Sequence, residues 1–148
     1  MSSHPASTEV FDVTARKFHQ AASAVLLAVG FILSGRAELA LLTIVGIVML
    51  AGRFWWPADI FRQLVWRVLE PAHILPRIDR QEDHETRRVA RVLGGVLILI
   101  SAIVLATGNS WGWVFAAATA VLIFFDAAFD FCLLCFLAYW GSRTFRAA

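Results

Sequence analysis

Two cysteines and two aspartates stand close together in a strongly apolar stretch of the sequence. Cys132 and Cys135 form a Cys-x-x-Cys pair, and Asp126 and Asp130 precede it. Two thiols at this spacing could act as a redox dithiol or supply two of the four ligands of a metal site. The alternative without chemistry is that both cysteines are small packing residues.

Each chemical reading of the cysteine pair meets a physical obstacle. In a regular helix, residues i and i+3 have Cβ atoms about 5–6 Å apart, whereas a disulfide needs about 3.5–4.5 Å, so closure requires a local distortion. An apolar environment also favours the thiol over the reactive thiolate. A metal would need further ligands, from His19 or from another chain. We therefore predict no metal site, and the sequence identifies no cofactor.

The aspartates and the cysteines lie on opposite faces if this stretch is one helix. At about 100° per residue, Asp130 lies about 40° from Asp126, Cys135 about 180° and Cys132 about 240°. Neither aspartate can then act as a base for either cysteine. A carboxylate in a span costs about 2.5–3.5 kcal/mol on insertion scales and faces the protein interior or a wet cavity. The functional reading of Asp126 and Asp130 is a path for protons or a small solute.

The alternative for the aspartates is a polar pair that fixes helix packing. Its hydrogen-bond partner would then be a hydroxyl group or a backbone carbonyl. The candidate hydroxyl groups are those of Ser101, Ser34 and Thr43.

The elements that position these residues are predicted to be membrane helices. Apolar residues make up 59% of the 148 residues, against about 45–50% in soluble domains. A span needs about 20 apolar residues, and the sequence has four apolar segments. They are Phe18–Ser34, Leu39–Ala51 with the aromatic residues that follow it, Val92–Thr107 and Trp113–Tyr139. The predicted fold is an all-α membrane protein with four transmembrane helices in two hairpins.

The basic residues predict the orientation of these helices. Of the 13 Lys and Arg residues, only Arg36 stands in a predicted loop on the far side. Because cytoplasmic loops carry the excess of Lys and Arg, the central segment and both termini should be cytoplasmic. The predicted location is the inner (plasma) membrane, with several passes.

A short amphipathic helix is expected between the two hairpins. Along residues 59–70, apolar residues occupy one half of a helical projection, and Asp59, Arg62 and other polar residues occupy the other. Such a helix beside a span lies in the headgroup plane. The residues predicted to contact this interface are Phe61, Leu64, Val65, Trp66 and Val68. A docking face for a partner protein is the alternative.

These assignments make one four-helix membrane domain over residues 1–148. Residues 1–17 form a cytoplasmic tail whose first ten residues are frayed. The first hairpin covers 18–56, the cytoplasmic connector 57–91, the second hairpin 92–140 and a C-terminal tail 141–148. His19 is expected to be a hydrogen-bonded residue at the cytoplasmic mouth of the first span.

The last apolar segment resembles a known family. The run FDAAFDFCLLCFLAY is similar to the last helix of a bacterial integral-membrane family classified as domain of unknown function 4395. The matching residues are Ala127, Ala128, Phe129, Cys132, Cys135 and Tyr139, while Asp126 and Asp130 replace the usual Asn and Gly. The resemblance implies a membrane fold and an association with sulfurtransferase or thioredoxin-like proteins.

The expected function is thiol, sulfur or electron handling through Cys132 and Cys135 together with a partner. We expect no catalytic activity of the chain alone. The expected partners are the lipid bilayer, and either other membrane subunits or a cytoplasmic thiol or sulfur-transfer protein. Nucleic acid is not expected, and a homo-oligomer is left open. The two alternatives are a structural or accessory subunit of a larger membrane complex, and proton or small-solute transport via Asp126.

Overall fold

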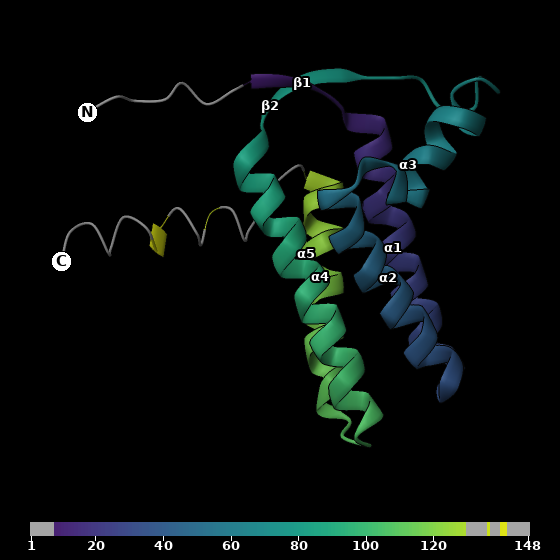
Figure 1. Ribbon diagram of the computed structural model, residues 1–148, viewed down its shortest axis with the longest axis vertical. Coiled ribbons are helices and arrows are strands. Elements are labelled where there is room, and N and C mark those ends of the chain that lie inside the picture. Colours follow the sequence, from purple (N-terminus) through teal and green to yellow (C-terminus); the bar gives the residue numbers. More distant parts are fainter. Residues whose placement is uncertain (1–7, 130–135, 137–139, 142–148) are drawn as a thin grey trace.

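Four long helices run side by side in the computed structural model, which describes residues 8–129, 136, 140 and 141 (Figure 1). They pack so that α2 contacts both α1 and α4, and α5 contacts both α1 and α4. The four helices are α1 (Val13–Leu33), α2 (Arg36–Phe54), α4 (His84–Ala106) and α5 (Trp111–Phe129). The predicted helical class is therefore confirmed.

Within the residues that the structure describes, three helices are long and apolar enough to cross a membrane. They cover Arg36–Phe54, Arg88–Ala106 and Trp111–Phe129. α1 is not among them, and its first turns carry Arg16, Lys17 and His19. The membrane character is thus supported by length and composition, and the number of spans stays a prediction.

Two helices begin earlier than the apolar runs that predicted them. α1 starts at Val13, because the Asp12 side chain accepts hydrogen bonds from the backbone N–H groups of Thr14 and Ala15, which caps the helix. α4 starts at His84, well before the first residue of its apolar run. Charged first turns belong to these helices although they lie outside the apolar pattern.

A small antiparallel sheet closes one end of the bundle. Strand β1 (Thr8–Asp12) pairs with β2 (Asp79–Asp83), with Asp12 opposite Asp79. We expected residues 1–10 to be frayed, and this was wrong for the residues from Thr8 onward. The pairing joins segments far apart in the sequence, so no local pattern indicates it.

Glycines allow α2 and α4 to approach closely. A Cβ atom on Gly46 would lie 2.7 Å from the side chain of Leu99, and one on Gly95 would lie 2.9 Å from Leu50 Cγ. Such distances are shorter than normal van der Waals contacts, so a larger residue would force the helices apart. The core between the helices is apolar. It consists of Leu27, Leu42, Val45, Met49, Ile98, Ala102 and Ala116.

The connector lies at the same end of the bundle as the start of α1 (Figure 1). It contains the 3-10 turn η1 (Trp56–Ala58), α3 (Ile60–Leu64) and the π-helical turn η2 (Val65–Leu69). The helix predicted for residues 59–70 therefore exists, with a wider second half in which the N–H of Glu70 donates to the carbonyl of Val65 at 2.8 Å. Turns of this kind are rare and often lie at functional sites.

Candidate functional site

The centre of the candidate site is the carboxylate of Asp59, whose side chain is 1% exposed. Asp59 caps α3, since its Oδ1 accepts a hydrogen bond from the backbone N–H of Arg62 at 3.3 Å. Aspartate is among the best residues at this position, because it accepts from the unpaired N–H groups of the first turn. The cap holds the carboxylate at the start of the helix, turned toward the bundle.

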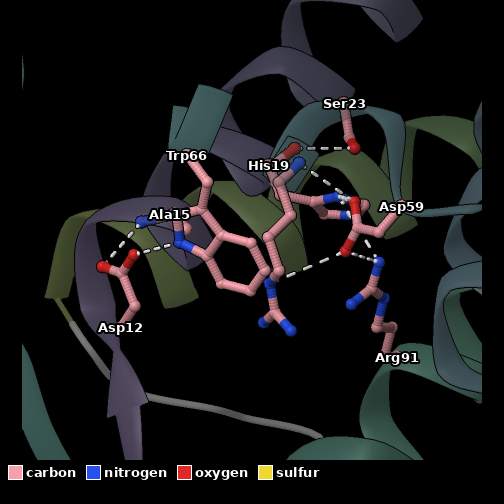
Figure 2. A network of polar contacts seen from close by, with 8 residues as sticks. Asp12, Ala15, His19, Ser23, Asp59, Trp66 and Arg91 are labelled. Atoms are coloured by element: carbon pink, nitrogen blue, oxygen red, sulfur yellow. Dashed lines mark hydrogen bonds and ion pairs between the residues drawn. The ribbon is translucent and has the colours of Figure 1, made fainter. Parts of the chain in front are cut away.

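Three cationic or polar side chains converge on this carboxylate (Figure 2). His19 Nδ1 lies 3.0 Å from Asp59 Oδ1, and Arg91 Nη2 lies 2.6 Å from Oδ2. The third, Arg62 Nε, is 3.9 Å from Oδ2. Together these four residues form what we call the Asp59 cluster. It joins α1, the connector and α4 through one carboxylate.

Space for the cluster is provided by Gly52 on α2. A Cβ atom there would lie 2.7 Å from Arg91 Nη2 and 2.9 Å from Asp59 Cβ. The absence of a side chain at this position thus allows Asp59 and Arg91 to meet against the end of α2.

The neighbouring donors and cations keep the carboxyl group of Asp59 ionised. Burial alone would raise the pKa of the carboxyl group, but the hydrogen bond from His19 and the charge and hydrogen bond of Arg91 lower the pKa to well below its usual range. The pKa of the Arg62 guanidinium is lowered, first by burial, but an arginine remains charged at neutral pH. Two guanidinium groups therefore surround one carboxylate, and the cluster carries net positive charge.

His19 has two further contacts, one through its backbone and one through its ring. Its backbone carbonyl accepts a hydrogen bond from the Ser23 hydroxyl at 2.8 Å, and the edge of its ring meets Phe61 at a centroid distance of 5.3 Å. Since the carboxylate of Asp59 can only accept, Nδ1 must carry the hydrogen of the neutral imidazole. Nε2 is buried and has no hydrogen-bond partner among the described residues.

A second carboxylate ties the connector to α1. Besides capping α1, Asp12 accepts a hydrogen bond from Trp66 Nε1 at 2.7 Å (Figure 2). Burial raises the pKa of Asp12, but the hydrogen bonds from Trp66, Ala15 and Thr14 outweigh it, so that the pKa is lowered. The helical part of the connector is therefore attached to α1 through His19 and through Asp12.

Asp126 lies between α5 and α1. Its Oδ2 accepts a hydrogen bond from Gln20, the residue that follows His19. We expected a hydroxyl group or a backbone carbonyl as partner. The hydroxyl groups of Ser101 and Thr43 instead donate to carbonyls of their own helices. The prediction did not include the amide side chain of Gln20 as a donor, because it considered only charged residues, hydroxyl groups and backbone carbonyls.

The connector side chains divide differently from the predicted halves. Leu64 and Val68 are 42% and 50% exposed, as expected for contact with an interface, whereas Val65 is fully buried. The largest difference concerns Asp59, which the helical projection placed on the polar, water-facing half and which the structure buries. The sequence signal for its role was present, since an aspartate that directly precedes a helix is a typical cap.

Part of the predicted site lies outside the described residues, namely Cys132, Cys135 and Asp130. Within the described part of the chain, no group of three or more His, Cys, Asp or Glu side chains could hold a metal ion.

The charge of Asp59 makes a pH dependence testable. Because its pKa is lowered in the folded protein, its contribution to stability is complete above the unfolded value of about 4 and is lost as the pH falls below that value. We expect the difference in unfolding free energy between wild type and Asp59→Asn to shrink as the pH falls from about 4 to 3. Reversible unfolding in mixed micelles measures it. A constant difference down to pH 3 would contradict this assignment.

Comparison with known proteins gives a family and no function. A family model described as Domain of unknown function (DUF4395) matches residues 11–143. No curated protein and no solved structure matches the chain. The matched range contains both the Asp59 cluster and the cysteine pair.

Proposed function

The chain belongs to the DUF4395 family of domains of unknown function, and we propose that this member is an integral membrane protein that exchanges thiols, sulfur or electrons with a partner. The reactive groups in this proposal are Cys132 and Cys135. The partner is a protein that carries a disulfide or another transferable sulfur group.

The proposed topology has four spans, with α1 as the first. α1 packs along α2 and α5, two of the three helices that are apolar enough to cross a membrane. The connector and both termini are proposed to be cytoplasmic, because almost all Lys and Arg residues belong to these segments. The apolar residues Leu64 and Val68 on the connector would then contact the inner membrane surface.

The observation that carries the proposal is the Asp59 cluster. Buried ionisable groups with shifted pKa values and specific charge partners are candidates for functional sites. This cluster has one carboxylate and two guanidinium groups, and the described part of α5 ends at Phe129 at the same end of the bundle (Figure 1). A positive environment favours the thiolate over the thiol, and the thiolate is the form that reacts. The net charge of the cluster therefore supports thiol chemistry at this end.

The proposed exchange moves two electrons. One cysteine thiolate attacks a disulfide of the partner, which forms a mixed disulfide and releases one partner thiolate. The second cysteine thiolate attacks the mixed disulfide and releases the other partner sulfur. The products are a Cys132–Cys135 disulfide and a reduced partner, which takes up the two electrons and two protons that the cysteine pair loses.

Single-cysteine variants test this proposal. In native membranes, Cys132→Ser or Cys135→Ser is expected to accumulate a mixed disulfide with a partner protein, because the resolving thiol is missing. The adduct should disappear on reduction and be absent from the double variant, which is the matched control. Gel shift and mass spectrometry identify it. If neither single variant forms a reducible adduct, thiol exchange with a protein partner is refuted.

An accessory role in a larger membrane complex is the second candidate. It is favoured by the exposed aromatic side chains Phe124, Phe125 and Phe129 on α5, which are 60%, 47% and 68% exposed. Large exposed apolar patches mark contacts with lipid or with protein. Under this candidate the cysteines would be packing residues and no reducible adduct would form.

A further inference from the structure

The Asp59 cluster contains a buried nitrogen, Nε2 of His19, that the proposed thiol exchange does not use. The side chain of His19 is 8% exposed and its Nε2 atom is buried. Nδ1 faces Asp59, whereas Nε2 has no donor or acceptor within hydrogen-bond distance in the part of the chain that the structure describes. Buried polar atoms are nearly always paired in folded proteins, so an exception calls for an explanation.

The surroundings of His19 favour the neutral imidazole over the protonated one. The charged groups that face it are Asp59 and Arg62 from the connector and Arg91 from α4. In the neutral imidazole, Nδ1 donates to Asp59 and only an acceptor is left unpaired. A proton on Nε2 would create a buried donor without an acceptor and would add a third cation to a group that holds one carboxylate. The carboxylate of Asp126 on α5 accepts a hydrogen bond from Gln20, the residue that follows His19.

His19 contacts the helical part of the connector. The connector is attached to α1 by the His19–Asp59 and Asp12–Trp66 contacts and to α4 by the Arg91–Asp59 ion pair. Its outer residues Ile60, Leu64 and Val68 are exposed, and its second half is a π-helical turn. Two of these contacts involve Asp59, so a change at His19 acts directly on one of the residues that hold the helical part of the connector. The chain beyond this part is joined to the start of α1 separately, through Ile78 and Pro76.

We propose that His19 is the proton-binding switch of a latch between the connector and the bundle. The latch is closed while Nε2 is unprotonated and opens when Nε2 binds a proton, which releases Asp59 and the following helix. This inference does not depend on thiol exchange at Cys132 and Cys135 and stays testable if that exchange is absent.

Hydrogen exchange of the connector amides tests the latch in the full-length protein in lipid nanodiscs. After correction for intrinsic rates, the protection of residues 60–69 should fall about tenfold or more between pH 7.5 and 5.5, the range around the ordinary histidine value of about 6.5. His19→Gln should abolish this pH dependence. The matched control His73→Asn should keep it, since His73 is exposed and has a φ of 55° that asparagine tolerates.

A second measurement needs no change at His19. In a variant whose other histidines are replaced (His4→Asn, His73→Asn and His84→Asn), the ¹⁵N spectrum at pH 7.5 should show a protonated Nδ1 and an unprotonated Nε2. The Nε2–H tautomer at this pH would overturn the proposal. So would connector protection that is constant or increases toward pH 5.5, since protonation would then strengthen the His19–Asp59 contact.

Discussion

Replacing Asp59 with alanine is expected to lower the free energy of unfolding by about 3–5 kcal/mol, the usual cost of removing one partner of a buried ion pair. The variant leaves Arg91 and Arg62 without their carboxylate and His19 without the acceptor for its Nδ1–H. It also removes the cap of α3. Unfolding of the purified protein in mixed micelles measures the loss.

The matched control is Asp79→Ala. Asp79 pairs with Arg77 at 3.0 Å, but the two side chains are 42% and 57% exposed. An exposed pair contributes about 0–1 kcal/mol, so the control should stay close to wild type. An Asp59→Ala variant as stable as Asp79→Ala would show that the cluster does not hold the connector.

Replacing Gly52 with alanine should destabilise the protein by about 1–3 kcal/mol, the usual range for overpacking. The added Cβ would lie 2.9 Å from Asp59 Cβ and 2.7 Å from Arg91 Nη2. The flexible arginine could move away, but Asp59 Cβ is fixed by the cap, so the connector itself must shift. At most other helical positions the same change is favourable, because alanine forms helices better than glycine by about 1 kcal/mol.

The helical Gly141 provides the control, since no atom of the described residues lies within 4 Å of a Cβ built there. Gly141→Ala should leave stability unchanged or raise it slightly. The unfolding free energies of both variants separate overpacking at Gly52 from the better helix formation of alanine. Hydrogen exchange of the connector shows whether the connector shifts. Equal stability of the Gly52→Ala and Gly141→Ala variants would contradict the close approach at Gly52.

The bundle could be predicted from the sequence because its signals are local. Apolar runs located the four helices. The charged first turns of α1 and α4 were missed, since they depend on a cap at Asp12 and on a helix that extends beyond its apolar part.

The candidate site was harder to predict because its parts are distant in sequence. Asp59 meets Arg91 over 32 residues and His19 over 40. A helical projection of the connector contains only its own residues, and it therefore assigns a charged side chain to water even when the partner is buried elsewhere. Gln20 was missed as the partner of Asp126 for another reason, because the expected partners were hydroxyl groups and backbone carbonyls and not amide side chains.

The structure describes the Asp59 cluster, whereas Cys132 and Cys135 lie outside the described residues. The cluster explains how the helical part of the connector is held. The thiol function itself depends on Cys132 and Cys135 passing electrons as a pair.

A redox titration of the protein in native membranes tests this central claim most directly. Membranes are equilibrated in glutathione buffers of known potential, and the free thiols are then alkylated and counted by intact mass. We predict that both thiols disappear together in one transition in which a tenfold change in the equilibrium constant takes about 30 mV, as a two-electron couple requires. Two thiols that stay alkylatable at every potential, or that disappear independently, would contradict the proposed function.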